Sequence, residues 1–206
     1  MTTYVNKNLT KELSPKCREL KKEFEELVRE NITRDGIDEL MKYIEDETDF
    51  YTAPASTRFH CSEEGGLVRH SINVFNELSS NKSMAKDKYS DESIAIVSLF
   101  HDLCKVNMYE VSTRNVKDEF GRWKQVPYYT TNEQFPFGHG EQSVYLLMKH
   151  GLSITDEEAM AIRWHMGGFT DSVKGGSYSI SKAFSSSILA VELHIADLRA
   201  THIDEL

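Results

Sequence analysis

Residues 99–106 have the sequence LFHDLCKV, which places two ionisable side chains next to each other in an apolar segment. Burying His101 and Asp102 together costs free energy unless other groups pair with them. Two interpretations are open from this octapeptide alone: the pair caps a turn, or it holds a metal ion. Lys105 follows three positions after Asp102. The rest of the sequence has to decide between the two interpretations.

The composition is that of an ordinary globular chain of 206 residues, with 39% hydrophobic and 28% charged residues. This length suggests one domain and is enough to bury a sizeable core. No apolar run of the sequence approaches the ~18 residues that cross a bilayer. The first residues also lack the apolar core of an export signal. We therefore expect a cytoplasmic protein without a membrane partner.

The formal net charge of −9 argues against a protein that coats long nucleic acid, because such binding relies on a basic surface. The charge does not exclude a small anionic substrate that is held by a few local cations or by metal ions. The three cysteines, Cys17, Cys61 and Cys104, are scattered and form no CxxC pair. The sequence therefore indicates neither a disulfide framework nor a thiolate zinc site.

The apolar periodicity predicts a mostly helical chain. Residues 16–31 and 35–48 are expected to form an N-terminal helical hairpin, with Ser14 and Pro15 as its cap and first turn. Further helices are expected at residues 66–80, 92–105, 138–150, 155–166 and 184–202. Asp91 is the expected cap of the helix at 92–105. The last helix is apolar nearly all round and is expected to be central.

Three segments lack helical periodicity. Residues 51–66 indicate a loop that ends in two glycines. Residues 107–136 alternate polar and β-prone residues around Gly121, which predicts a β-hairpin or a structured loop. The Gly/Ser-rich stretch 167–187 is typical of a mobile loop. The predicted fold is all-α with a small β-hairpin insertion, with a helical extension at residues 1–50 packed on a main domain at residues 51–206.

Several histidines and one aspartate are predicted to lie on apolar helix faces or at helix ends: His70, His101, His139, His165 and Asp197. Taken singly, such a histidine is more often a hydrogen-bonded core residue, and a buried aspartate is more often a cap or half of an ion pair. As a set with Asp102 they fall on five predicted helices. Facing helices of an all-α fold are the usual way to bring such groups to one site. Imidazole and carboxylate together suit Mn, Fe, Co, Ni or Zn better than Ca.

Five short motifs, in this order, are GGLVRHS, LFHDLCK, FGHGEQS, AIRWHMGG and HIADLRA. Together they resemble the HD-domain metal-dependent phosphohydrolase superfamily, over residues 65–201. The sequence is most similar to the six-ligand branch, such as the HD domain of a bacterial 3′→5′ exoribonuclease. The resemblance implies an HD-domain helical bundle and an enzyme that hydrolyses phosphoester bonds.

The resemblance also implies a role for each matched residue. The residues implied to hold the first of two divalent metal ions are His70, His101, Asp102 and Asp197. Asp102 would bridge to a second ion that His139 and His165 also hold. Lys105 matches a lysine that faces the substrate phosphate or the bridging water, so Asp102 and Lys105 are the expected catalytic residues. The ions implied are drawn from Mn, Fe, Ni, Co, Mg or Zn. The alternative for Lys105 is a solvated cation at a helix end.

Two departures limit the resemblance. Branches that bind cyclic dinucleotides carry a second histidine and a GYP signature, whereas this sequence has Met166 and no GYP. The exoribonuclease also carries a separate OB domain, whereas the helical pattern within residues 1–64 predicts that such a domain is absent here. These departures set aside the cyclic-dinucleotide branch and count against processing of long RNA.

Further candidate residues flank this set. Arg58 and His60 precede Gly65 and either meet a substrate phosphate or form an exposed loop pair. His194 lies one turn before Asp197, as the partner of a ligand or as a helix-face residue. Aromatic residues around the predicted hairpin either stack a base or pack on the core: Trp123, Tyr128, Tyr129 and Phe135.

Three functions are consistent with the sequence. The first is a phosphohydrolase that cleaves a phosphate ester of a nucleotide or short oligonucleotide with a metal-activated hydroxide. The second is a nuclease acting on single-stranded RNA or DNA, with the hairpin and residues 167–187 forming the strand channel. The third is a non-catalytic sensor or interaction module with a structural metal. The substrate, the native metal and the oligomeric state stay open.

Overall fold

The computed structural model describes residues 12–80, 82–133 and 135–206 of the chain. Two helices come first, α1 (Pro15–Asn31) and α2 (Ile37–Glu47). α1 begins as predicted, because the Ser14 hydroxyl accepts a hydrogen bond from the Cys17 N–H and Pro15 takes the first helical position. Residues 1–11 of the predicted N-terminal extension lie outside the described residues.

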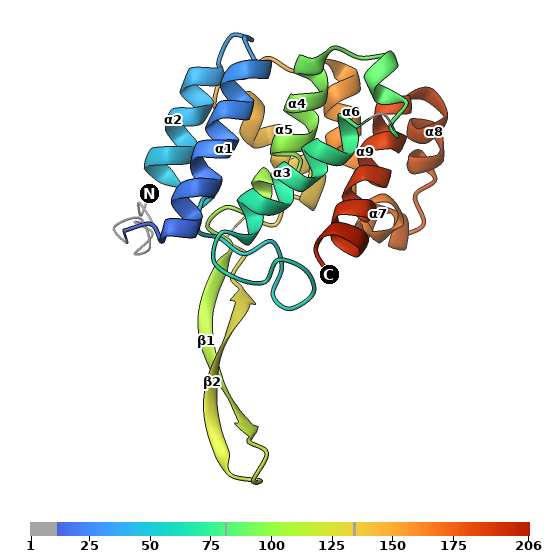
Figure 1. Ribbon diagram of the computed structural model, residues 1–206. Coiled ribbons are helices and arrows are strands. Elements are labelled where there is room, and N and C mark those ends of the chain that lie inside the picture. Colours follow the sequence, from blue (N-terminus) through green and yellow to red (C-terminus); the bar gives the residue numbers. More distant parts are fainter. Residues whose placement is uncertain (1–11, 81, 134) are drawn as a thin grey trace.

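Four helices make the centre of the helical body: α3 (Gly66–Leu78), α4 (Asp91–Phe100), α6 (Asp156–Trp164) and α9 (Ile188–Arg199). α4 and α9 each pack against both α3 and α6 (Figure 1). α5 (His139–Lys149) covers α6, and α1 covers α3 and α4. None of the described helices is both long and apolar enough to cross a bilayer.

The N-terminal helices share one hydrophobic core with the rest of the body. The ring of Phe24 in α1 lies 4.8 Å from that of Phe50 and 5.7 Å from that of Phe100 in α4, measured between centroids. All three side chains are fully buried. The division of the chain at residue 50 stays a prediction.

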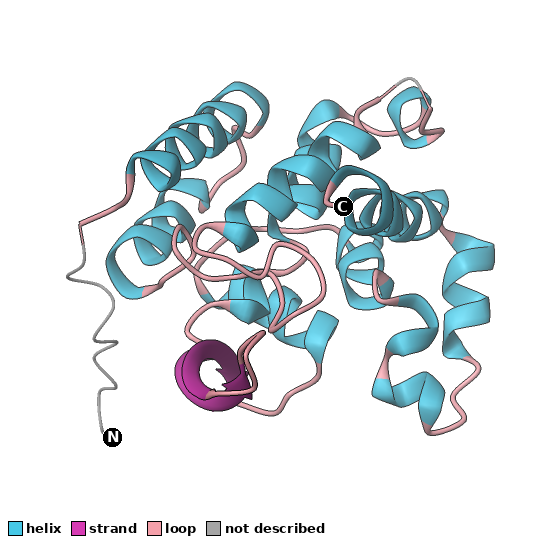
Figure 2. Ribbon diagram, turned by 60° about the horizontal axis from the view of Figure 1, so that its bottom comes forward, coloured by secondary structure: helices cyan, strands magenta, loops and turns pink. Residues whose placement is uncertain are grey.

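A β-hairpin, β1 (Tyr109–Lys117) and β2 (Trp123–Thr131), projects from the helical body as an arm (Figure 1). The strands are antiparallel and pair Tyr109 with Thr131 at the base and Lys117 with Trp123 near the tip. Figure 2 shows this arm end-on. The hairpin prediction is confirmed, but the arm does not pack on the core, since Trp123 is 70% exposed.

The predicted helix at 92–105 is wrong at both ends. α4 stops at Phe100, and a short 3₁₀ helix, Leu103–Lys105, follows after a turn. The backbone N–H of Cys104, which a longer helix would bond to its own preceding turn, donates instead to the Ser143 hydroxyl of α5 at 3.0 Å. The N-cap is Ser90 rather than Asp91, because the Ser90 hydroxyl accepts from the Ser93 N–H.

The loop predicted at 167–187 is also wrong, since this stretch contains α7 (Asp171–Lys174) and α8 (Ser179–Ser186). α7 has a Thr170 cap, and α8 packs against α6 and α9 with Ala183 and Phe184 turned to the core. The many glycines and serines of this stretch make its short apolar face hard to detect in the sequence. The helix predicted at 184–202 is also too long. α9 covers only Ile188–Arg199, and a π-helical turn, Ala200–Asp204, follows it.

Candidate metal centre

The six residues predicted to bind metal converge on one place inside the helical body. They come from the middle of α3 (His70), the ends of α4 and α6 (His101, Asp102 and His165), the first position of α5 (His139) and the last turns of α9 (Asp197). Contacts of 3.5 Å or less link all six. Segments that are far apart in the chain therefore supply one cluster.

One half of the cluster surrounds the Nε2 atom of His70. This atom lies 3.2 Å from Asp197 Oδ1, 3.3 Å from His101 Nε2 and 3.5 Å from Asp102 Oδ2. A metal ion that binds nitrogen and oxygen at about 2.0–2.2 Å holds neighbouring ligand atoms about 3.0–3.5 Å apart. The spacing of these donor atoms is therefore compatible with that of a metal's ligands.

The other half surrounds the second carboxylate oxygen of Asp102. Its Oδ1 lies 2.7 Å from His139 Nε2 and 3.4 Å from His165 Nε2. His165 is fully buried, and its Nε2 has no hydrogen-bond partner among the described residues. Leaving such a buried acceptor unpaired costs free energy. A cation bound between His165 and Asp102 would remove that cost.

Lys105 adds a fixed positive charge to the cluster. Its Nζ lies 2.6 Å from Asp102 Oδ2, and both residues are buried. The interpretation of Lys105 as a solvated cation is therefore wrong. Burial opposes the charge of Lys105, but the facing carboxylate of Asp102 outweighs burial and raises the lysine pKa further.

Backbone carbonyls orient two of the imidazoles. The Nδ1–H of His101 donates to the Ser98 carbonyl at 2.7 Å, and that of His165 donates to the Ile162 carbonyl at 2.6 Å. Each histidine directly follows a helix end, where carbonyl groups lack their usual partners. The Nε2 atom of each ring is thereby left as an acceptor that faces the centre of the cluster.

Protons balance the carboxylate charges around His70. Burial alone would lower the pKa of His70, but hydrogen bonds with Asp197 and Glu205 outweigh it and raise this pKa to about 9. At His101 burial dominates, and the pKa falls to about 3. A protonated His70 therefore places one Nε2 proton among three acceptors, where a divalent cation can replace it.

Burial and nearby charges also compete at the half of the cluster that contains His139. Burial opposes the charge of His139, but Cys104 and Asp102 outweigh it and raise the pKa of His139 to about 10. Burial favours neutral Asp102, yet the charge of Lys105 and the nearby imidazoles hold its pKa well below the usual range. Asp102 is therefore ionised over the whole physiological range.

Gly140 lets the two histidines of this half meet. A Cβ atom at Gly140 would lie 2.5 Å from the Arg163 carbonyl oxygen and 2.7 Å from that of Ile162. The start of α5 can approach the end of α6 this closely only without a side chain at residue 140. The rings of His139 and His165 consequently lie 5.2 Å apart, measured between centroids.

The two predicted phosphate contacts have different surroundings. The guanidinium of Arg58 is exposed and lies 5.0 Å over the ring of Phe59. His60 lies beside the cluster, with its ring centroid 4.7 Å from that of His70. His194 supports the cluster indirectly, because its Nδ1–H donates to the His165 carbonyl at 2.6 Å. The phosphate-binding roles of Arg58 and His60 stay predictions.

Sequence reasoning missed two neighbours of the cluster. Cys104 Sγ lies 3.3 Å from His139 Nδ1, although the cysteine spacing gave no reason to place it there. Glu205 accepts a hydrogen bond from His70 Nδ1 at 2.9 Å. Glu205 belongs to the polar segment THIDEL, in which no apolar pattern indicates an inward side chain.

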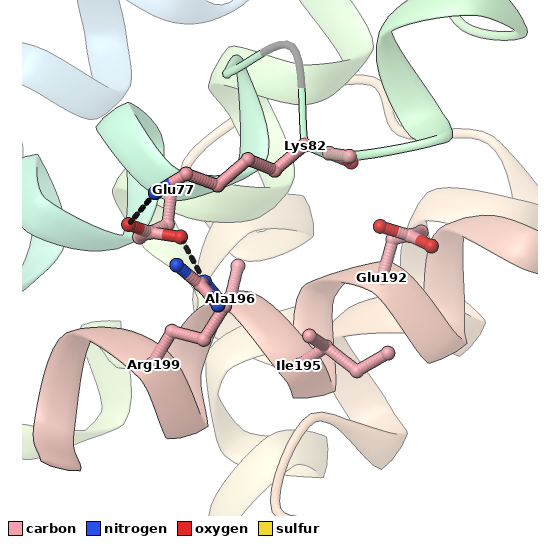
Figure 3. A pocket seen from close by; sticks show the side chains of 7 residues that line it. Glu77, Lys82, Glu192, Ile195, Ala196 and Arg199 are labelled. Carbon is pink, nitrogen blue, oxygen red and sulfur yellow. Dashed lines mark hydrogen bonds and ion pairs between the residues drawn. The ribbon is translucent and has the colours of Figure 1, made fainter. Parts of the chain in front are cut away.

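Two hollows lie apart from the cluster. A cavity of about 200 Å³ at the base of the arm is lined by Asp49, Thr52, Ala53, Pro54, Glu64, Tyr109, Val111 and Tyr129. Figure 3 shows a hollow of about 20 Å³ between α3 and α9. There Glu77 pairs with Lys82 at 3.8 Å and with Arg199. Neither lining includes a predicted metal ligand.

No known protein family, curated protein or solved structure matches this chain. The structure itself provides a buried cluster of histidine, aspartate and cysteine side chains whose donor atoms are close enough to hold metal ions. This cluster lies in a mostly helical protein with a small two-stranded sheet.

Proposed function

We propose that this protein is a metal-dependent phosphohydrolase that cleaves a phosphate ester of a nucleotide or short oligonucleotide. One observation carries the proposal: the two oxygens of the Asp102 carboxylate face two separate groups of donor atoms. A carboxylate shared in this way suits a pair of metal ions. Two metal ions about 3.5–4 Å apart can stabilise both the attacking and the leaving oxygen of a phosphoryl group. The resemblance to the HD-domain superfamily supports the same reaction.

The residues of the cluster would have distinct roles in this reaction. His70, His101 and Asp197 would hold one ion and His139 and His165 the other. A bound divalent ion lowers the pKa of its water from about 15.7 toward about 7, which supplies hydroxide at neutral pH. The ionised carboxylate of Asp102 would fix the relative position of the two halves. Lys105 would donate to a phosphate oxygen as negative charge grows there.

The donor chemistry restricts the ions. Imidazole nitrogens and carboxylate oxygens together favour Mn, Fe, Co, Ni or Zn. Elemental analysis of the purified protein should give a metal-to-chain ratio near two. A ratio near one would remove His139 and His165 from the ligand set.

A hydrolysis assay with a matched pair of variants tests the proposal. The protein loaded with Mn²⁺ is offered a panel of nucleotides and generic phosphodiesters. We expect turnover in the wild type and in Asp171→Asn, an exposed position on α7. Asp102→Asn should lose turnover by at least about 100-fold. Protein that carries metal but hydrolyses nothing would overturn the proposal and leave a non-catalytic sensor or interaction module.

A nuclease acting on single strands is the second candidate, and the arm supports it. Cations lie over aromatic rings along both strands and the turn: Arg114 over Tyr128 at 5.4 Å, Lys117 over Trp123 at 5.2 Å and Arg122 over Phe120 at 5.1 Å. Bases stack on exposed aromatic rings while cations contact the phosphates. Binding of a labelled oligonucleotide with a steep salt dependence would favour this candidate.

A further inference from the structure

We infer that Glu205 is a positioning residue of the candidate metal centre. Its carboxylate holds the imidazole of His70 with Nε2 turned toward the ions, and it ties the loop that carries His60 to the same point. The inference rests on the metal-binding part of the proposed function. It concerns a residue that lies outside the motifs shared with the HD-domain superfamily.

The Glu205 side chain is almost completely buried, with 1% of its surface exposed. Its Oε1 accepts hydrogen bonds from His70 Nδ1 and Asn73 Nδ2, both at 2.9 Å, and its Oε2 accepts from His60 Nδ1 at 2.8 Å. A carboxylate offers about four acceptor sites, so three donors occupy most of them. These three contacts fix the orientation of the carboxylate and of both rings.

The acceptor of the Nδ1–H group is different for His70 than for His101 and His165. The Nδ1–H groups of His101 and His165 donate to neutral backbone carbonyls, whereas that of His70 donates to a carboxylate. A carboxylate behind a ligating histidine fixes its tautomer and ring orientation and makes its other nitrogen a stronger donor to the metal. Glu205 would therefore act on a bound ion through His70.

The π-helical turn explains how Glu205 reaches His70. In a regular α-helix, a residue eight positions after Asp197 would point roughly 80° away from it. The chain leaves α-helical geometry at Ala200, and the Glu205 N–H donates to the Ala200 carbonyl at 3.1 Å, five residues back. A π turn has more residues per turn and brings Glu205 back toward the face of Asp197. One carboxylate then meets each ring nitrogen of His70.

A separate metal site is the competing interpretation of this group, since donor atoms of His60, Cys61 and Glu205 lie within 4.8 Å of one another. The observed contacts favour positioning. The Glu205 oxygens already accept hydrogen bonds from two imidazoles and an amide, and a metal ion would have to break them. A third metal equivalent that is lost in Cys61→Ser would overturn the positioning role.

Glu205→Gln keeps the shape of the side chain and removes its charge. Glu192→Gln, on α9, is the matched control because it lies beside the small hollow and away from the cluster. Zn²⁺ affinity is measured by competition with a chelator. We expect Kd about 10- to 100-fold weaker in Glu205→Gln and unchanged in Glu192→Gln. Equal affinity in Glu205→Gln and wild type would overturn the inference.

A second measurement uses the wild type alone, so it stands if the variant does not fold. Long-range ¹H–¹⁵N spectra of the Zn²⁺-loaded protein should show His70 protonated at Nδ1 and bound to the ion through Nε2. An ion bound to Nδ1 of His70 would overturn the positioning role. Wild type that binds no ion would end both proposals, whereas metal-loaded protein without hydrolysis would end the proposed function alone.

Discussion

At the centre of the cluster a single lysine faces a single carboxylate, with Lys105 Nζ 2.6 Å from Asp102 Oδ2. Lys105→Met keeps the apolar stem and removes the cation. If Lys105 contacts the phosphate, kcat should fall by about 100-fold. The metal-to-chain ratio should stay as in wild type, because loss of a nearby cation does not weaken metal binding. Steady-state kinetics and elemental analysis of the same sample check this.

Thermal unfolding of Lys105→Met provides the control, since removing one partner of a buried ion pair costs roughly 3–5 kcal/mol. The kinetics are therefore measured well below the unfolding midpoint of the variant. A folded, metal-loaded Lys105→Met that keeps the kcat of wild type would leave Lys105 as a structural partner of Asp102 only.

The raised pKa values of His70 and His139, about 9 and about 10, predict that metal binding releases protons. Both rings are protonated at pH 7 in the metal-free chain, and a metal ion binds only the deprotonated nitrogen. Affinity should therefore rise with pH up to about 10, the higher of the two pKa values. About two protons should leave per chain when both halves fill. Calorimetry in buffers of different ionisation enthalpy counts these protons, and a buffer-independent binding enthalpy would contradict the prediction.

The sequence predicts the members of the cluster well where a motif marks them and poorly where it does not. His101 and Asp102 stand out because they are adjacent in an apolar segment. Glu205 is 135 positions from His70 and lies among polar residues, so no local pattern connects the two. Cys104 meets His139 from the short 3₁₀ helix that follows the end of α4. Contacts of this kind depend on tertiary structure, which periodicity does not report.

At the scale of one element, the spacing of apolar residues does not predict where α4 ends. Ile94, Val97, His101 and Cys104 share a helical spacing, which predicts a helix that includes them all. Spacing indicates which face is buried, but not which acceptor a backbone N–H meets. The Ser143 hydroxyl, from another helix, takes the Cys104 N–H. The turn that results lets His101 and Asp102 contact both halves of the cluster.

The approach of α5 to α6 gives a prediction at the same scale. In Gly140→Ala the new methyl group would meet the Arg163 carbonyl at about the 2.5 Å calculated for a Cβ atom. The helices must separate, at a cost of about 1–3 kcal/mol. His139 and His165 then part, and the metal-to-chain ratio should fall from about two toward one, as elemental analysis measures.

Gly168→Ala is the matched control, because a Cβ atom there meets no atom within 4 Å. We expect its metal content and unfolding temperature to equal those of wild type. A Gly140→Ala protein with the metal content of wild type would mean that His139 and His165 do not hold an ion together.

The whole molecule joins a helical body, which contains the cluster, to an arm that extends away from it (Figure 1). Helical periodicity and the alternation around Gly121 predict both parts. They do not predict that the arm stands free, because alternation indicates strands without saying what each face meets. The net charge of the arm also differs from that of the whole chain. The chain carries −9 overall, whereas residues 109–131 hold four cations and three carboxylates.

Shortening the arm tests which substrate the whole molecule takes. Replacing residues 113–127 with an Asn-Gly turn removes all four cations of the arm, Arg114, Lys117, Arg122 and Lys124, together with Trp123, and leaves the base of the hairpin at Tyr109. The predicted metal ligands lie in the helical body, so if the protein hydrolyses a small generic phosphodiester, the shortened arm should leave that rate unchanged. If the arm binds single strands, affinity for a labelled oligonucleotide should fall, and the slope of log K against log salt should become shallower by about three, at about 0.7 for each of the four cations.

A version of the full arm with Arg114, Lys117, Arg122 and Lys124 replaced by Gln separates charge from stacking. Its salt slope should match that of the shortened arm, while the aromatic rings keep part of the affinity. Titrations at several salt concentrations measure both quantities. If all three proteins bind the oligonucleotide alike, the arm has no part in binding, and the nuclease candidate loses the observation that favours it. The proposed cleavage of a nucleotide at the cluster, which does not involve the arm, would then be the remaining hydrolytic candidate.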